Sequence, residues 1–184
     1  LMPYLYGHNL RLRSAERTDI PQFLRWVNDP EVVENLEVYA PLGTVEEEGW
    51  FDAMKARPID EHALVIEVHP EGSDDKWVVI GNTSFFPINQ KARSVEIGIM
   101  IGEKDYWNKG YGTEVMRTMC RYGFEELNLN RIWLRVYDTN PRARKAYEKA
   151  GFIYEGTLRQ AEYKHGCYMD VHVMSILKSD WIKS

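Results

Sequence analysis

Gly110 and Gly112 have a spacing that suits phosphate chemistry, because they can bring bare backbone amides close to an anion. They lie between a predicted strand and a predicted helix whose apolar residues form one stripe. Two glycines around a single residue allow a tight turn, and the helix that follows adds unpaired N–H groups and the positive end of its dipole. The segment indicates a pyrophosphate site, although a turn that binds no ligand fits the same glycines.

A second segment, from Asn140 to Phe152, has the pattern of a short capped helix. Asn140 can accept the first free amides as the N-cap, Pro141 fits the first turn, and Gly151 suits a left-handed C-cap. Three alanines and Tyr147 recur at helical spacing and form one narrow apolar face. Spacing alone makes Tyr147 a core aromatic, but so thin a face leaves room for another group to approach.

The predicted strand from Ser94 to Ile101 alternates in character. Its odd-numbered residues are all Val or Ile and point to one face, whereas Glu96 and Gly98 point to the other. A carboxylate beside a glycine on a central strand indicates a groove in which a ligand passes over the backbone. The alternative is a carboxylate paired with an arginine such as Arg93 or Arg135.

The run from Trp107 to Thr113 resembles the acyl-coenzyme A motif of the GNAT superfamily of N-acetyltransferases, whose pattern is Gln or Arg, two arbitrary residues, Gly, any residue, then Gly or Ala. Trp107 departs from this pattern, because Gln or Arg is expected at its position. The longer run from Tyr106 to Glu114 is similar to the RimL-like branch, the ribosomal-protein N-acetyltransferases. The segment Asn140–Phe152 matches the second half of the superfamily signature, and the resemblance extends from Leu10 to about Leu177.

The resemblance implies acetyl-coenzyme A (acetyl-CoA) as co-substrate. Its diphosphate would lie on the main-chain nitrogens of the glycine turn, and its pantetheine arm would pair with the edge of the central strand like an added β-strand. The residues implied in donor binding are Ile99, Met100, Ile101, Asn108, Lys109, Gly110, Tyr111, Gly112, Thr113, Asn140 and Tyr147.

The same resemblance implies three catalytic groups. Tyr147 would donate a proton to the departing thiolate, a role that suits a phenol whose ordinary pKa is about 10. Glu96 precedes Gly110 by 14 positions in the sequence (110 − 96), the spacing shown by the base glutamate of histone-acetylating members. By that resemblance it would accept the amine proton through water, although some members rely on solvent instead. The Met100 amide would polarise the thioester carbonyl.

Several elements must position these residues. The sequence predicts a mixed, mostly antiparallel sheet flanked by helices, an α/β (α+β) fold in a single domain spanning residues 1–184. Strands are expected at 10–13, 63–68, 77–86, 94–101 and 131–137, with a final strand pair that ends near 177 and a turn at 70–75. Helices are expected from about 20 to 27, from about 44, from about 110 to 127, and at 141–150.

Composition excludes several other classes. The 184 residues carry a formal net charge of -5, which argues against a nucleic-acid binder and suits a cationic substrate. Two cysteines cannot form a disulfide framework, and no metal is expected, because the five histidines show no ligand spacing. No apolar run approaches the length of a membrane span and the start lacks a signal pattern, so the expected location is the cytoplasm, without membrane association.

The sequence thus predicts direct transfer of an acetyl group from acetyl-CoA to a primary amine in a ternary complex. The branch resemblance favours a protein or peptide N-terminus as acceptor. A polyamine or an aminoglycoside-like molecule, a longer acyl donor, and a non-catalytic acyl-CoA sensor stay open as alternatives, as does a homodimer. Four acids, Asp29, Glu31, Glu34 and Glu37, are either a lining of the acceptor side or a solvated loop.

Overall fold

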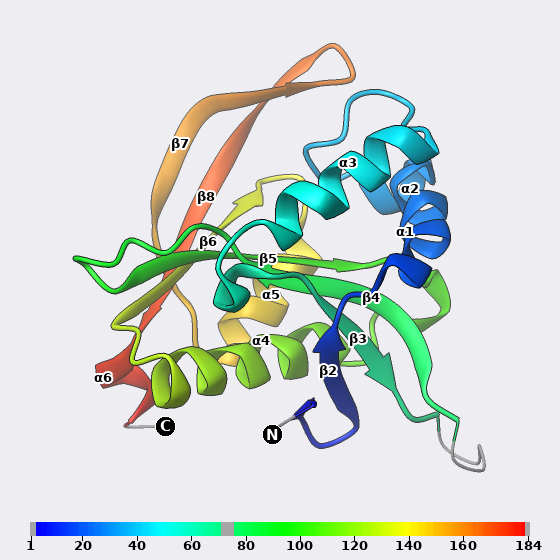
Figure 1. Ribbon diagram of the computed structural model, residues 1–184. Coiled ribbons are helices and arrows are strands. Elements are labelled where there is room, and N and C mark those ends of the chain that lie inside the picture. Colours follow the sequence, from blue (N-terminus) through cyan, green and yellow to red (C-terminus); the bar gives the residue numbers. More distant parts are fainter. Residues whose placement is uncertain (1–2, 71–75, 183–184) are drawn as a thin grey trace.

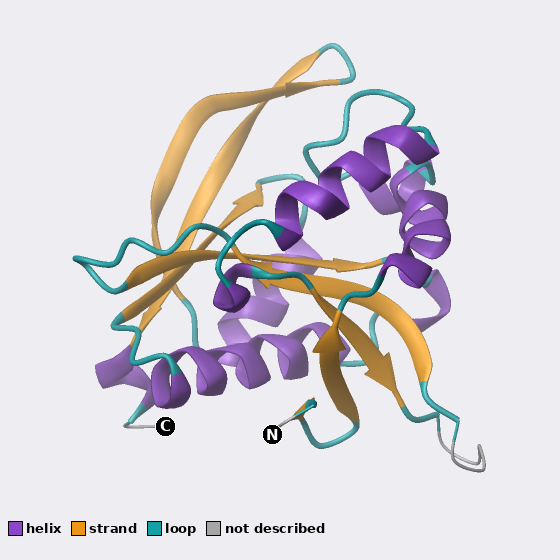
Figure 2. Ribbon diagram, in the orientation of Figure 1, coloured by secondary structure: helices purple, strands orange, loops and turns teal. Residues whose placement is uncertain are grey.

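The structure is a computed structural model that describes residues 3–70 and 76–182, which form one sheet with helices on both faces (Figure 1, Figure 2). The turn predicted at 70–75 falls almost entirely outside these residues. The sheet has the strand order β1-β2-β3-β4-β5-β6-β8-β7. The strands are β1 (Leu5–Tyr6), β2 (Leu10–Ser14), β3 (Leu64–Val68), β4 (Val78–Phe85), β5 (Ser94–Ile101), β6 (Arg131–Tyr137), β7 (Ile153–Lys164) and β8 (Cys167–Leu177).

Two layers of helices cover the sheet, and each has its own apolar core. One layer contains α1 (Ile20–Val27), α2 (Pro30–Val33) and α3 (Thr44–Lys55), and its core is built around Phe23, Trp26 and Phe51. The other layer contains α4 (Tyr111–Arg121), extended by the π-helical turn η4 (Tyr122–Glu126), and α5 (Pro141–Ala150). The alternation of side chains along each strand supplies both cores from the same strands.

The pairing of β5 changes along its length. On one side it pairs with β4 in antiparallel fashion up to the pair Gly81–Ile101. On the other side it pairs with β6 in parallel, but only from Ser94 to Glu96. β6 meanwhile stays paired with β8 as far as Tyr137. The two central strands therefore diverge after Glu96, and one edge of β5 from Ile97 to Ile101 faces no neighbouring strand in the described sheet.

The predicted mixed, mostly antiparallel sheet flanked by helices is confirmed, with β5–β6 as the parallel pair. The predicted bounds of β5, β6 and α5 are those observed. Short elements escaped prediction, namely β1, α2, α6 (Lys178–Trp181) and the 3₁₀ turns η1 (Arg17–Asp19), η2 (Ile59–Glu61) and η3 (Lys104–Tyr106). Segments of two to four residues are too short to show a hydrophobic period.

Replacing Gly81 tests how tightly β4 holds the end of β5. A Cβ at Gly81 would lie 2.0 Å from the backbone oxygen of Met100. Because that neighbour is ladder backbone, we expect Gly81→Ala to lower the free energy of unfolding by about 2 kcal/mol, measured by urea denaturation. A Cβ at Gly156 meets nothing within 4 Å, so Gly156→Ala is the control, with an expected change of about 0.5 kcal/mol or less. Equal losses in the two variants would contradict this packing.

Candidate active site

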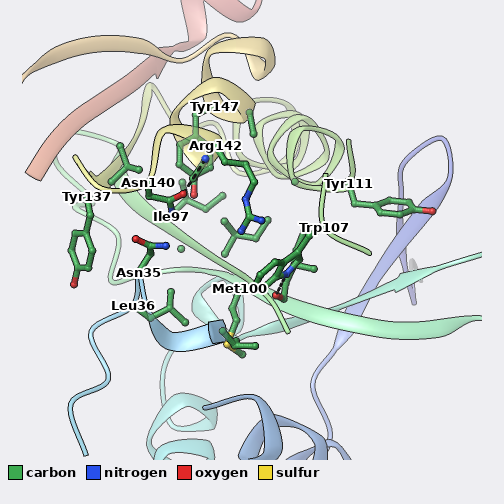
Figure 3. Close-up of a pocket in the computed structure, with 18 of the residues that line it drawn as sticks. Asn35, Leu36, Ile97, Met100, Trp107, Tyr111, Tyr137, Asn140, Arg142 and Tyr147 are labelled. Carbon is green, nitrogen blue, oxygen red and sulfur yellow. Dashed lines mark hydrogen bonds between the residues drawn. The ribbon is translucent and has the colours of Figure 1, made fainter. Parts of the chain in front are cut away.

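A cavity of about 360 Å³ opens where β5 and β6 diverge, and it is lined from both faces of the sheet (Figure 3). Its wall on the α4–α5 side includes Gly110, Thr113 and Tyr147. The opposite wall includes Leu36 and Glu37, from the segment that follows α2. The gap between the strands thus joins two chemically different surfaces through the middle of the sheet.

The turn before α4 forms part of the first wall. Asn108 and Gly110 both adopt left-handed backbone conformations, with φ of 59° and 83°, a conformation that asparagine and glycine tolerate best. A Cβ added to Gly110 meets no atom within 4 Å, so the cavity reaches the backbone here. Gly112 follows in the first turn of α4, which points its N-terminus into the same space. This cradle fits the diphosphate predicted from the sequence.

The predicted donor-binding residues lie together around the cavity, with one exception. All of them except Lys109 contribute to the lining. The Lys109 ammonium instead lies over the Tyr106 ring, 5.5 Å from its centroid.

The N-terminus of α5 completes this wall. The side-chain oxygen of Asn140 accepts a hydrogen bond from the Ala143 N–H at 3.2 Å, as expected of an N-cap. Ala143 and Ala146 line the cavity, so the thin apolar face does leave space for another group. Thr113 holds α4 against α5 by donating to the Ala146 carbonyl at 3.1 Å.

Tyr147 combines the two roles that its spacing left open. Its ring packs against the core and against Phe152, with 6.2 Å between ring centroids, and it also lines the cavity (Figure 3). Burial raises the pKa of the Tyr147 phenol to about 12. The hydroxyl is therefore protonated at neutral pH, as a proton donor must be.

The backbone of β5 alternates between β4 and the cavity. The Phe86 N–H donates to the Glu96 oxygen, and the Gly102 N–H donates to the Ile80 oxygen, so even-numbered residues turn their polar groups toward β4. The odd-numbered residues, among them Ile99, face the unpaired edge. The Met100 amide, predicted to polarise the thioester, follows the even-numbered pattern and points toward β4, and its role stays a prediction. The alternation instead turns the amides of Ile99 and Ile101 toward the unpaired edge.

Glu96 lies on the opposite face from Tyr147. Its carboxylate accepts a hydrogen bond from Arg135 Nε at 2.7 Å, so the pairing considered as the alternative to a catalytic role does exist. Arg93 instead donates to the backbone oxygens of Leu127 and Asn128. Glu96 also lines the cavity, and the pairing leaves its role as a base a prediction.

Arg135 holds two further carboxylates near the cavity. Its guanidinium lies 3.0 Å from Glu37 and 3.9 Å from Glu162. Tyr39 donates to the Glu162 carboxylate at 2.8 Å. Burial, together with the nearby Tyr39 hydroxyl and Glu162, raises the pKa of the buried Tyr137 phenol. Three acids share one arginine, so this wall carries an excess of negative charge.

Of the four acids that the sequence left as either an acceptor lining or a solvated loop, two line the cavity, namely Glu31 and Glu37. Glu34 turns away to His165, and Asp29 caps α2 and pairs with Lys104. The sequence indicated Arg135 only as a possible partner of Glu96 and assigned Arg142 no role of its own within the capped helix. It did not single out Glu162, which comes from a strand that carries no local motif.

Among the described residues, no group of three or more His, Cys, Asp or Glu could hold a metal ion. None of the described helices is long and apolar enough to cross a membrane.

The open glycine turn at the N-terminus of α4, the unpaired edge of β5 and the buried Tyr147 phenol face an acidic wall across one gap. This arrangement is the one that a transferase of acyl groups to amines would need. Residues 9–153 match the acetyltransferase (GNAT) domain family. The chain is 29% identical to the uncharacterised N-acetyltransferase p20 of Bacillus licheniformis, over 98% of this chain and 99% of that protein. It is 30% identical to the spermidine N(1)-acetyltransferase of Vibrio cholerae, over 94% and 95% of the two chains.

The fold agrees with these matches. The crystal structure of the spermidine N-acetyltransferase from Vibrio cholerae in complex with CoA and spermine superposes with a TM-score of 0.83, at 29% identity, over 95% of this chain and 98% of that one. The chain belongs to the GNAT acetyltransferase family and is an N-acetyltransferase that uses acetyl-CoA as co-substrate.

Asn140 allows capping and donor binding to be separated. Asn140→Ala removes the acceptor for the Ala143 amide, so we expect the free energy of unfolding to fall by about 1 kcal/mol, measured by urea denaturation. Asn140→Asp keeps a capping oxygen and should keep the stability, but its negative charge beside an anionic donor should weaken acetyl-CoA binding, measured by calorimetry. Unchanged acetyl-CoA affinity in Asn140→Asp would place the donor away from this residue.

Proposed function

We propose that this protein acetylates a primary amine of a small polycation, such as a polyamine, by direct attack in a ternary complex. The observation that carries this proposal is the gap between β5 and β6, which connects the wall that contains the glycine turn to an acidic wall. A polyanionic donor and a polycationic acceptor would each meet a surface of opposite charge. Their reacting groups would meet in the gap, where neither needs a covalent enzyme intermediate.

On the donor side of the gap, each element would have a distinct task. The turn around Gly110 would hold the diphosphate, and the unpaired edge of β5 from Ile97 to Ile101 would bind the pantetheine arm by backbone hydrogen bonds. Acetyl-CoA supplies the thioester. Tyr147 would give its Oη proton to the departing sulfur, which its raised pKa permits because the phenol stays protonated.

The acceptor side must bind an ammonium and then remove a proton from it. Glu96 lies on this side of the gap, and its carboxylate could receive that proton through a water molecule. Arg135 now neutralises Glu96, and an incoming ammonium would share this carboxylate with the guanidinium. Solvent stays the alternative base.

The choice of a polyamine rests on charge and on the relatives. Glu37, Glu96 and Glu162 surround one guanidinium, so two negative charges lack a cation within this cluster. A molecule with several ammonium groups would neutralise them, whereas a peptide N-terminus brings one. The similar proteins of Vibrio cholerae are named as spermidine acetyltransferases. The protein N-terminus and the RimL-like branch, which the sequence favours, stay predictions, as does a homodimer.

Replacing Tyr147 tests the proton donor. We expect Tyr147→Phe to lower kcat by about a hundredfold and to leave acetyl-CoA affinity nearly unchanged, because the ring still packs on Phe152. Since the pKa of Tyr147 is about 12, its ionisation should cause no loss of wild-type activity as the pH rises from 7 to 10. Tyr154→Phe, which removes an exposed hydroxyl on β7, serves as the control. Equal kcat in wild type and Tyr147→Phe at every pH would exclude the role.

The acceptor is tested by following CoA release with spermidine, with propylamine and with a short peptide bearing a free N-terminus. We expect the largest kcat/KM with spermidine. Glu162→Gln should raise KM for spermidine about fivefold, which corresponds to the loss of about 1 kcal/mol of attraction by a partly exposed charge. The change in KM for propylamine should be smaller.

Glu34→Gln is the matched control for this series, because Glu34 pairs with His165 and does not line the cavity. It should leave every acceptor unchanged. Acetylation of the peptide without acetylation of spermidine would replace the polyamine with a protein N-terminus. Release of CoA with none of the amines would remove the proposed function altogether.

A further inference from the structure

Trp107 and Arg142 make a contact at the rim of the cavity that the sequence did not suggest (Figure 3). The Trp107 indole donates from Nε1 to the Ile101 carbonyl at 2.8 Å, which fixes the ring at the end of β5. Arg142, from the first turn of α5, places its guanidinium carbon 4.4 Å from the centre of that ring. The stack joins the end of β5 to the start of α5 beside the glycine turn.

The charge of Arg142 is unusual for its place. A cation in the first turn of a helix opposes the helix dipole, and α5 has no acidic residue in that turn to offset it. Among the described residues, Arg142 has no carboxylate within ion-pair distance, whereas Arg135, the other arginine that lines the cavity, is held by three acids. An arginine that opposes the helix dipole and has no carboxylate to neutralise it is expected at a functional site.

The surroundings of Arg142 favour a strongly anionic ligand. The N-termini of α4 and α5 both face the cavity, and the open backbone at Gly110 lies on the same wall. An exposed ammonium or guanidinium ligand would be repelled here, and an apolar one would gain little from a guanidinium. A planar guanidinium suits the oxygens of a phosphate, which it can bind with two parallel hydrogen bonds.

We infer that Arg142 binds the diphosphate of acetyl-CoA and that Trp107 is a positioning residue, which holds the guanidinium ready by stacking under it. The inference rests on the proposed binding of the donor on this wall. It also accounts for the departure at Trp107. The position that carries Gln or Arg in the superfamily pattern here carries an aromatic ring, and the cation that stacks on this ring is Arg142 from α5. Stacking lowers the conformational freedom that Arg142 must lose on binding.

The test compares three donors that differ in their phosphates. Acetyl-CoA carries the diphosphate and the ribose phosphate, acetyl-3′-dephospho-CoA keeps only the diphosphate, and acetylpantetheine has neither. We expect Arg142→Gln to lower kcat/KM about tenfold with the first two donors and to leave acetylpantetheine unchanged, with kcat at saturation unaffected. Arg142→Lys should recover part of the loss, because the charge stays and the stack is weakened.

Trp107 is tested in the same assay. Trp107→Leu should reproduce the donor-specific loss, and should add little when combined with Arg142→Gln, because both changes remove one interaction. Lys145→Gln is the matched control, since it removes a positive charge from an exposed position of α5 that does not line the cavity. Its kcat/KM should stay within about twofold of wild type.

Each other outcome overturns the inference. An equal loss with acetylpantetheine would show that Arg142 only supports the structure of the rim. A loss confined to acetyl-CoA would assign Arg142 to the ribose phosphate. Equal kinetics of wild type and Arg142→Gln with all donors would leave it without a role in binding. In all three cases wild-type turnover of acetyl-CoA persists, whereas its absence would instead refute the proposed function.

Discussion

The divergence of β5 from β6 after Glu96 is the constraint on which the site depends. β5 and β6 separate because β5 stays paired with β4 and β6 stays paired with β8. The N–H groups of Gly102 and Glu103 both donate to the Ile80 oxygen and keep the end of β5 on β4. β6 remains paired with β8 as far as Tyr137. The resulting gap exposes backbone groups that a sheet would otherwise satisfy internally, and a buried unpaired amide is stable only if a ligand or water can reach it.

The first helical layer secures this opening from one side. The added Cβ at Gly102 would lie 2.1 Å from the Trp26 ring, so the indole packs directly on the backbone that follows β5. The Trp26 Nε1 donates to Glu103 at 3.0 Å, which ties α1 to the same point. A close contact between a large ring and a glycine leaves no room for a side chain at this position, so the end of β5 packs directly on α1.

The two walls of the gap differ in charge. One wall presents helix N-termini and Arg142, and the other presents carboxylates gathered around Arg135. Tyr147 lies on the first face and Glu96 on the second, so the predicted proton donor and the predicted base belong to different elements. Opposite fields on either side of a narrow opening would orient an anionic donor and a cationic acceptor toward it.

The sequence by itself determined the local pieces: the glycine turn, the Asn140 cap, the alternation of β5 and the family, because each depends on residues close together in the chain. Tertiary structure decided what those pieces face. The pairing of Glu96 with Arg135, the gathering of Glu37 with Glu162, and the stack of Arg142 on Trp107 join residues from distant segments. No local spacing encodes such contacts, because they follow from the way the sheet opens and brings separate elements to one gap.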